Sequence, residues 1–409
     1  MVSEHASPLA VLGGEDAGGQ NVHVAALSGA LAARGHQVEV YTRRDDPELP
    51  ERVALHHGVV VVHVPAGPQR ALPKDALAEH MPAFGRWLAH RWQHDTPDLV
   101  HTHFWMSGVA GLVARDVVPV PTVHTFHALG SVKRRYQGAA DTSPPDRIDV
   151  EAALARAMDA VIATCTDEVN ELLALGAPAE ALHVVPCGVD VHQFTPHGHG
   201  QPRSDRPRLV CAGRLVERKG VATAIAALTH TPRVELVVAG GPAAAELHTD
   251  PSSRRLLDLA EELAVADRVR LLGRLDHVAL PPLLRSADAV VAVPWYEPFG
   301  IVPLEAMACG VPVIASAVGG MLDTVIDGVT GVRVPPNDPD ALAAAVLRLL
   351  AEPRRRAAMG RAGARRAARR YAWERVAADT ETIYRRVLYG TAPRRSARVS
   401  LPAIQGVAG

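Results

Sequence analysis

The segment EPFGIVPLEAMACGVPVIAS, residues 297–316, decides the fold of this chain. Pro298, Gly300 and Pro303 interrupt regular structure at its start, and the residues after them favour a helix that Gly310 would end. The final apolar residues, PVIA, predict a buried strand. A loop, a short helix and a buried strand form the repeating unit of a parallel α/β sheet.

Two carboxylates, Glu297 and Glu305, lie within this segment. The first would precede the helix and the second would lie in its first turns, at the sheet edge where open α/β sheets bind ligands. Carboxylates accept hydrogen bonds from hydroxyl groups, and a helix start attracts anions. The pair therefore predicts a ligand rich in hydroxyls with an anionic group, such as a nucleotide sugar. The alternative is that both are ordinary surface acids.

Length and charge limit the class of protein. A chain of 409 residues exceeds the roughly 250–300 residues that one core supports, so we expect two domains. The formal net charge of −1 argues against a nucleic-acid partner, and no apolar run approaches the roughly 20 residues of a membrane span. The start lacks a secretory pattern, and the four cysteines show no CxxC spacing. We expect a cytoplasmic protein with free thiols.

Strand and helix patterns alternate in two series. The stretch TPHGHGQPRSDRP has Gly, Pro and charge without periodicity, and it predicts a linker between the series. The expected fold is α/β, with two doubly wound, Rossmann-like domains facing a central cleft. The expected parts are a first domain at 1–195, the linker at 196–207, a second domain at 208–372, a helix at 373–390 that packs back on the first domain, and a disordered tail at 391–409.

Arginine is concentrated at 354–370 and 394–398. The first of these sets alternates with alanine at helical spacing. We expect a solvated helix face there rather than a site for a polyanion.

Two glycine-containing segments precede predicted helices. DAGGQNVHVAALSGALA (16–32) places Gly19 where free backbone N–H groups would bind an anion, although a simple tight turn is the alternative. GRLVERKG (213–220) supplies Arg214 and Lys219, which could both reach one diphosphate. The alternative for these two is exposure at a domain edge, and Arg218 is expected at the surface.

Histidines end two predicted strands, in HTH (101–103) and HTFH (124–127). We expect hydrogen-bonding roles at the cleft floor, with His124 as the preferred residue, while buried structural histidines are the alternative. No acidic ligand falls at a suitable spacing, so no metal site is predicted.

Basic residues in first-domain loops predict an anionic acceptor. Lys74 lies in one such loop, and Lys133, Arg134 and Arg147 lie in a predicted loop over 130–147. Converging cations of this kind suit a phosphate or a carboxylate. Solvated loop residues are the alternative.

These features together resemble retaining glycosyltransferases of family 4, which have the GT-B fold, and most closely the sucrose-phosphate synthase and D-inositol-3-phosphate glycosyltransferase branch. The resemblance covers nearly the whole chain. It rests on the segments GGQNVHV, YTRRDDP, HTHFW, HTFHALGSVKRR, VPCGVD, GRLVERKG and EPFGIVPLE…GVPVIAS…GG.

The resemblance implies roles for individual residues. Glu297 would hold the hydroxyls of the donor sugar, Glu305 the ribose, and Arg214 and Lys219 the diphosphate. Gly19 would close on the diphosphate from the other domain, and His124 would lie beside the transferring sugar. The remaining implied positions are the donor-binding backbone of Phe299, Gly300, Ile301 and Val302, and an acceptor set of His5, Asp16, Asn21, Lys74, Thr125 and Arg147, to which Lys133 is added from its loop position.

The chain departs from the family pattern at two places. Relatives that use inositol phosphate have a tyrosine where this chain has Phe104, so one hydroxyl contact to that acceptor would be lost. The first strand usually has several apolar residues before the His-Ala-Ser-Pro segment, and this chain has only Met1 to Glu4 there. Either this strand is unusually short or the start codon lies upstream, and we expect the second.

The implied reaction is transfer of a hexosyl group, glucosyl or N-acetylglucosaminyl in type, from a nucleotide-diphosphate sugar to a small polar acceptor such as an inositol phosphate or sugar phosphate. The donor is expected to be a UDP-sugar, and no cofactor is expected. Alternatives are a nucleotide-sugar epimerase, a natural-product glycosyltransferase with a non-phosphorylated acceptor, and a non-catalytic nucleotide-sugar-binding protein. A homodimer is left open.

Overall fold

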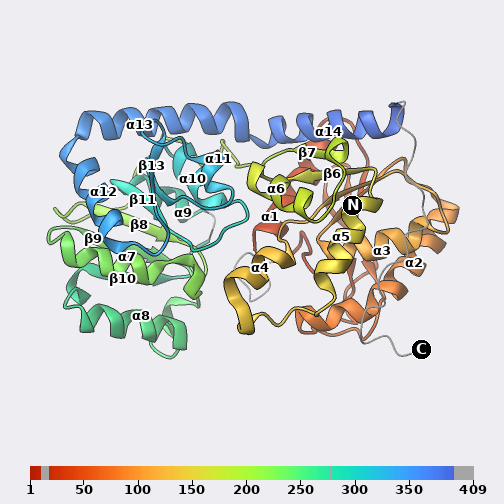
Figure 1. The fold of residues 1–409 in the computed structure, drawn as a ribbon, viewed down its shortest axis with the longest axis horizontal. Coiled ribbons are helices and arrows are strands. Elements are labelled where there is room, and N and C mark those ends of the chain that lie inside the picture. Colours follow the sequence, from red (N-terminus) through yellow and green to blue (C-terminus); the bar gives the residue numbers. More distant parts are fainter. Residues whose placement is uncertain (11–17, 277, 391–409) are drawn as a thin grey trace. The chain divides into compact units, whose positions relative to one another are not determined.

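A computed structural model describes residues 1–10, 18–276 and 278–390 of the protein. The chain forms two compact units, and in each of them helices lie on both sides of a largely parallel sheet (Figure 1). The first unit holds Met1–Pro186 and the chain from Val376 onward, and the second holds Cys187–Arg375. Asp16 and the predicted tail over 391–409 lie outside the described residues.

The first unit contains two short sheets that one residue joins. Their orders are β1-β3-β2 and β4-β5-β6-β7, and every neighbouring pair is parallel except β2 with β3. Val2 forms parallel bridges to both Tyr41 and Thr102, so a single residue takes the position of the predicted first strand. The strands are β1 (Val38–Arg43), β2 (Arg52–His56), β3 (Val59–Val64), β4 (Val100–His103), β5 (Thr122–Thr125), β6 (Ala160–Ala163) and β7 (Leu182–Val184).

Helices cover this sheet and supply most of the large core side chains. Trp92, Trp105, Phe84 and Leu154 are fully buried. The last long helix also belongs to the first unit from Val376 onward. Its Tyr384 hydroxyl lies 2.7 Å from Nδ1 of His101. The helices are α1 (Gly19–Ala32), α2 (Met81–His94), α3 (Trp105–Arg115), α4 (Gly130–Gln137), α5 (Arg147–Ala157), α6 (Thr166–Ala174) and α14 (Trp373–Tyr389).

The prediction of a loop over 130–147 is wrong for the first half of this segment, because those residues form helix α4. The sequence of α4 is charged, but two of its residues, Gly130 and Val132, are buried against the rest of the unit. The Gly130 N–H donates to the buried Glu151 carboxylate at 2.7 Å, which satisfies one free amide at the helix start. Strand β2, which pairs with β3 around Gly58 (φ 78°), was not predicted either.

The second unit has one six-stranded parallel sheet of order β10-β9-β8-β11-β12-β13. Its strands are near-continuous apolar runs, as expected for a sheet covered on both faces. The last strand, β13, was not predicted from its short sequence GVRV. The strands are β8 (Arg208–Ala212), β9 (Glu235–Ala239), β10 (Val269–Gly273), β11 (Ala289–Ala292), β12 (Val313–Ser316) and β13 (Gly331–Val334).

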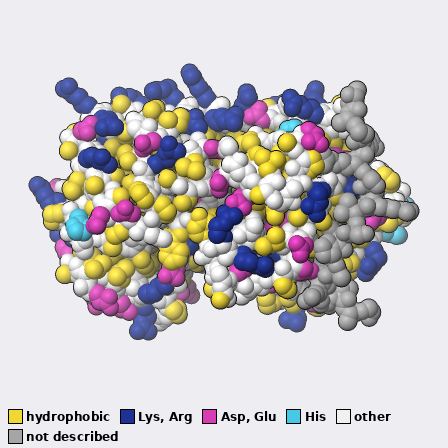
Figure 2. Space-filling model, in the orientation of Figure 1, with side chains coloured by type: hydrophobic (Ala, Val, Ile, Leu, Met, Phe, Trp, Pro, Cys, Tyr) yellow, Lys and Arg dark blue, Asp and Glu magenta, His cyan; other side chains and the backbone are white. Residues whose placement is uncertain are grey.

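The helices of the second unit include the arginine-rich one. Along that helix, α13, most of the arginines are exposed, and Figure 2 shows Lys and Arg side chains projecting where the helix runs in Figure 1. This agrees with the predicted solvated face. The helices are α7 (Val221–Ala227), α8 (Pro251–Glu262), α9 (Leu280–Arg285), α10 (Ile301–Ala308), α11 (Met321–Thr324), α12 (Pro339–Ala351) and α13 (Pro353–Arg366).

The segment predicted as a linker is bound to the second unit. Arg285 on α9 donates to the carbonyl oxygens of His199 and Thr195 at 3.0 and 3.2 Å, and the Gln201 N–H donates to the Pro282 carbonyl at 2.9 Å. A segment without helical or strand periodicity is therefore fixed by hydrogen bonds of its backbone carbonyl and N–H groups. The division between the units falls earlier, between Pro186 and Cys187.

The four cysteines are buried and free, as predicted. None of the helices in the described part of the chain combines the length and apolar character that crossing a bilayer requires.

Candidate active site

The loop before α10 holds Glu297 at the carboxyl end of β11. Gly300 has φ 85° and allows the sharp entry into α10, and Gly310 (φ 74°) follows its end, as predicted. A glycine pair packs against this loop: a Cβ added to Gly319 would stand 2.0 Å from the Glu297 carbonyl oxygen, and the Gly320 N–H donates to the Pro298 carbonyl at 3.1 Å. Side chains larger than hydrogen would therefore displace Glu297.

A second loop brings cations to the same carboxylate. After β8, the short helical turn Glu217–Lys219 ends at Gly220, whose φ is 72° and whose added Cβ would stand 2.0 Å from the Val293 carbonyl oxygen. The Lys219 ammonium donates a short hydrogen bond to the Glu297 carboxylate. The structure thus places the two predicted residues in direct contact.

Arg218 also belongs to this cluster, so its predicted surface position is wrong. Its guanidinium lies 3.6 Å from the same Glu297 oxygen and donates to the Tyr296 carbonyl at 3.3 Å. Nothing in GRLVERKG separates Arg218 from a solvated residue. Its inward position depends on partners in the loop at 296–297, which are remote in the sequence.

Electrostatics keep Glu297 ionised. Burial alone would raise its pKa, but Lys219 and Arg218, with Arg214 as a weaker contributor, hold the pKa below its ordinary value. Lys219 and Arg218 contact the carboxylate directly, whereas Arg214 is exposed and acts on it from farther away, so segments 213–220 and 297–305 lie side by side.

A pocket lies between these two loops, within the second unit. The start of α10 forms one wall, so its first backbone N–H groups border the same space as the cations. The pocket is lined by Cys211, Ala212, Gly213, Arg214, Lys219, Val221, Val238, Val291, Ala292, Pro294, Glu297, Gly300, Ile301, Val302, Pro303 and Met321. The ring of Phe299 is buried, with its centroid 6.3 Å from that of Tyr371, and Phe299 does not line this pocket.

Glu305 lies on α10 and is only 6% exposed. Burial raises the pKa of Glu305 to about 7. The two acids of the segment therefore differ in protonation at neutral pH: Glu297 is ionised, whereas Glu305 is divided between its protonated and ionised forms.

The pKa of Glu305 predicts a pH-dependent stability. The unfolded chain loses this proton near pH 4.5 and the folded chain near pH 7, so the free energy of unfolding falls as the pH rises through this window. From pH 4 to pH 8 the wild type should lose about 3 kcal/mol more than Glu305→Gln does. Urea unfolding of both proteins across this range measures the difference, and parallel curves would refute the prediction.

The first unit gathers several predicted acceptor residues around one aromatic ring. The Lys74 ammonium lies 4.0 Å from the centroid of Phe104, and the Arg147 guanidinium carbon lies 5.1 Å from it. The His5 ring packs edge-on against Phe104 at 4.9 Å. The Glu4 carboxylate fixes His5 through a contact of 2.5 Å with its Nδ1.

Lys133 is linked to this group through Ser143. The Ser143 hydroxyl accepts hydrogen bonds from Lys133 at 2.9 Å and from Arg147 at 3.1 Å. Each cation also has an acidic partner, Asp141 for Lys133 at 2.9 Å and Glu151 for Arg147 at 2.7 Å. Lys133 and Arg147 are thus held in place, whereas Arg134 of the same predicted set is exposed and donates to the Pro145 carbonyl at 3.5 Å, so its predicted convergence is wrong.

Asn21 and Thr125 have structural partners as well. The Asn21 side chain accepts from the Gly18 N–H and donates to the Ser7 carbonyl, both at 2.9 Å, and so fixes the start of α1. Gly19 is the first residue of that helix. The Thr125 hydroxyl lies 2.9 Å from Nε2 of His101.

His124, the preferred histidine, is fully buried. Its Nδ1 lies 2.7 Å from the Thr102 hydroxyl, and its ring packs edge-on against Phe126 at 4.2 Å. Its Nε2 is buried with no hydrogen-bond partner in the described chain. Burial lowers the pKa of His124 to about 3, so the imidazole is neutral.

Backbone strain marks the same edge of the first unit. Among the described residues other than glycine, four have positive φ. Two of these lie just beyond strands: Phe104 (77°) immediately follows β4, and His127 (61°) lies shortly after the end of β5. Such conformations cost on the order of 1–3 kcal/mol and cluster at functional sites. Neither conformation could be predicted from the sequence.

Two α/β units with parallel sheets, one of which holds an acid among cations at its carboxyl edge, define a glycosyltransferase of the GT-B class. The chain belongs to glycosyltransferase family 4. The sequence model described as Glycosyltransferase Family 4 matches residues 17–193, and the one described as Glycosyl transferases group 1 matches residues 197–366.

Two curated relatives show what the chain is similar to. The chain is 40% identical to the D-inositol 3-phosphate glycosyltransferase of Xylanimonas cellulosilytica, over 94% of this chain and 95% of the relative. It is 38% identical to the protein of that name from Kineococcus radiotolerans, over 97% of each chain. Among solved structures, sucrose-phosphate synthase from Thermosynechococcus elongatus matches with a TM-score of 0.88 and 34% identity, over 95% of this chain and 98% of that one.

Proposed function

We propose that the protein is a retaining glycosyltransferase that moves a glucosyl or N-acetylglucosaminyl group from a UDP-sugar to a small phosphorylated acceptor. The contact between Lys219 and Glu297 inside the pocket of the second unit carries this proposal. An ionised carboxylate accepts hydrogen bonds from sugar hydroxyls. An ammonium group has three donors, so Lys219 can serve Glu297 and a phosphate oxygen together.

The cations of the pocket act on the leaving group. When the bond between the sugar and the diphosphate breaks, negative charge develops on the diphosphate. Arg214 and Lys219 stabilise this charge, assisted by the free N–H groups of Ile301 and Val302 at the start of α10. Fixed positive groups of this kind need no reorganisation as the charge appears.

Retention follows from attack on the face that the diphosphate leaves. The bond between the anomeric carbon and the diphosphate oxygen breaks, and the acceptor oxygen bonds to the same face of that carbon. The acceptor proton passes to an oxygen of the departing diphosphate. Glu297 acts in this scheme by orienting the sugar, and the neutral His124 takes the role of a hydrogen-bonding partner near it.

The acceptor residues favour a phosphorylated molecule. Lys74 and Arg147 flank Phe104, and Ser143 joins Lys133 to this group. A phosphate placed over this cluster would receive charge-assisted hydrogen bonds from the cations. The names of the two classes of relative, inositol phosphate glycosyltransferase and sucrose-phosphate synthase, support the same chemistry.

The experiment that tests this function measures UDP release from UDP-glucose and UDP-N-acetylglucosamine, with and without pools of sugar phosphates and inositol phosphates. We expect fast release only when an acceptor is present, together with a glycosylated product of retained configuration by mass spectrometry and NMR. An isomerised nucleotide sugar formed without acceptor would establish an epimerase instead. Glycosylation of dephosphorylated acceptors alone would contradict the acceptor class.

The Phe104→Tyr variant tests the acceptor assignment. A hydroxyl added beside Lys74 and Arg147 restores the contact that the resemblance associates with inositol phosphate. We expect kcat/KM for inositol 3-phosphate to rise about 5- to 10-fold, as one hydrogen bond supplies about 1 kcal/mol. Unchanged or lower kcat/KM for that acceptor would show that Phe104 does not face it.

A further inference from the structure

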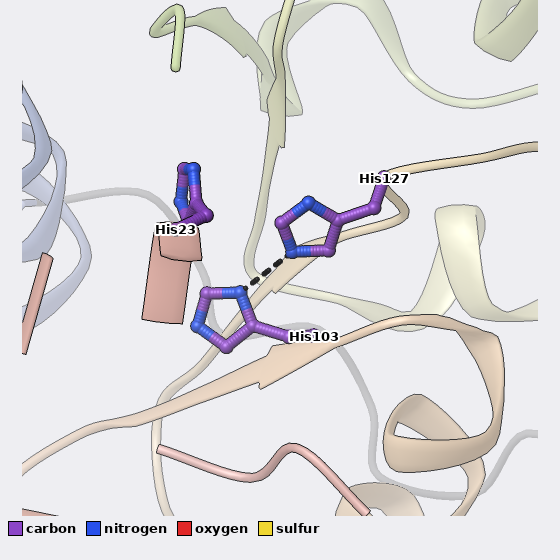
Figure 3. Close-up of side chains that lie close together, drawn as sticks. All are labelled: His23, His103 and His127. Carbon is purple, nitrogen blue, oxygen red and sulfur yellow. Dashed lines mark hydrogen bonds between the residues drawn. The ribbon is translucent and has the colours of Figure 1, made fainter. Parts of the chain in front are cut away.

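Three histidines from separate elements converge in the first unit, apart from the residues assigned above to donor and acceptor. His23 comes from α1, His103 ends β4, and His127 follows β5. Figure 3 shows their rings gathered around one space. One nitrogen from each ring lies within 4.8 Å of the nitrogens of the other two.

We propose that these three imidazoles bind a divalent transition cation of the Zn²⁺ type. Imidazole nitrogen is a preferred ligand of Zn²⁺, Co²⁺, Ni²⁺ and Cu²⁺, whereas Mg²⁺ and Ca²⁺ prefer oxygen. Two nitrogens bound to one tetrahedral Zn²⁺ at about 2.0–2.1 Å stand roughly 3.3 Å apart. His103 Nδ1 and His127 Nε2 are already 3.0 Å apart. A cation bound at this point would replace the proton that they share.

His103 offers its Nδ1 to the cation from the interior of the unit. This residue is fully buried, and its Nε2 has no hydrogen-bond partner within the described residues. Whichever nitrogen carries the proton, that atom remains unsatisfied. When Nδ1 binds the cation, Nε2 carries the proton, so the tautomer of His103 is defined. The His101 ring, centred 4.1 Å away, fixes the orientation of His103.

The backbone of His127 supplies an independent observation. Its φ of 61° lies in the left-handed region, which costs a residue other than glycine about 1–2 kcal/mol. This conformation turns the ring toward His103, where the two ring planes lie 26° apart with centroids separated by 5.2 Å. The strained backbone conformation therefore occurs at His127, the residue that completes the cluster.

Three protein ligands leave one position of a tetrahedral cation open to water or to an oxygen of a substrate. His103 immediately precedes Phe104, so the added positive charge would lie beside the cluster assigned to the acceptor. The site departs from the expectation of no metal because that expectation considered only HTH and HTFH. His23 lies far away in the sequence and gave no signal.

The test uses the full-length protein, stripped with a chelator, loaded with Zn²⁺ and dialysed. We expect about one equivalent of zinc by mass spectrometry, and a tetrahedral absorption spectrum when Co²⁺ replaces it. The variants His23→Gln and His127→Asn should lower the affinity by at least about 100-fold, more than loss of an outer-shell partner usually costs. Asparagine tolerates positive φ, so His127→Asn preserves the local backbone.

His90→Ala is the matched control. His90 and His94 are exposed on α2 with ring centroids 5.2 Å apart, and they form the obvious surface chelate. The control should keep the zinc. The proposal is overturned if the wild type retains no zinc, if either cluster variant binds zinc as the wild type does, or if only His90→Ala loses it. Circular dichroism of each stripped variant verifies folding, and if His23→Gln does not fold, His127→Asn alone decides.

Discussion

Replacing Lys219 by alanine reduces kcat by on the order of 10²-fold or more in the mechanism proposed here, because the diphosphate loses a fixed cation as its charge develops. The loss has a second source. Glu297 is buried and hydrogen-bonded to Lys219, so the variant leaves the carboxylate with weaker compensation from Arg218 and Arg214. The effect should appear in kcat as well as in kcat/KM, since the charge is greatest in the transition state.

Steady-state UDP release under saturating donor and acceptor measures this effect. Arg361→Ala provides the control. That arginine is exposed on α13, and its replacement removes one positive charge, as Lys219→Ala does. The control should retain wild-type turnover. A folded Lys219→Ala protein with near-normal kcat would remove Lys219 from the mechanism.

Glu297→Gln should separate sugar recognition from diphosphate binding. The amide keeps the shape of the side chain but cannot accept charge-assisted hydrogen bonds from the sugar hydroxyls, so we expect kcat to fall by about 10²-fold. UDP itself should bind at least as tightly as to the wild type. Lys219 and Arg218 then lose an anionic neighbour and become more available to the diphosphate.

Calorimetric titration with UDP, run beside the kinetic assay, distinguishes this outcome from general damage to the pocket. If UDP binding weakens as much as turnover does, Glu297 supports the pocket structurally and does not recognise the sugar. Unfolding in urea should confirm that the amide variant remains folded.

The local structure around Glu297 could be predicted because its information is local. Glycines and prolines around Glu297 specify the loop, the helix and the strand within one short segment, and the structure has Gly300 and Gly310 in the positive-φ conformations that only glycine adopts easily. The same holds for the turn at Gly220. Each prediction there depended on residues close together in the sequence.

The features that could not be predicted depend on contacts between distant residues. Helix α4 has a highly charged sequence, and its burial comes from Gly130 and Val132 packing beside α5. The inward position of Arg218 depends on Glu297, which is remote in the sequence. His23 is brought to His103 and His127 only by the sheet topology.

One compositional signal could have strengthened the site prediction. The chain has 43 basic residues, and only three of them are lysines: Lys74, Lys133 and Lys219. All three were assigned to the site, and in the structure each has an ordered partner there. In a chain whose other basic residues are arginines, a lysine marks a position where a compact cation with three donors suits the geometry.

The measurement that tests the central claim most directly is hydrogen–deuterium exchange of the full-length protein with and without UDP-glucose. Binding of the nucleotide sugar by the pocket of the second unit predicts slower exchange of amides in segments 211–221 and 299–305. Exchange in the interior of α5, which carries the acceptor residue Arg147, should be unaffected by the donor alone. No protection at 211–221 and 299–305, or protection confined to the first unit, would contradict the account.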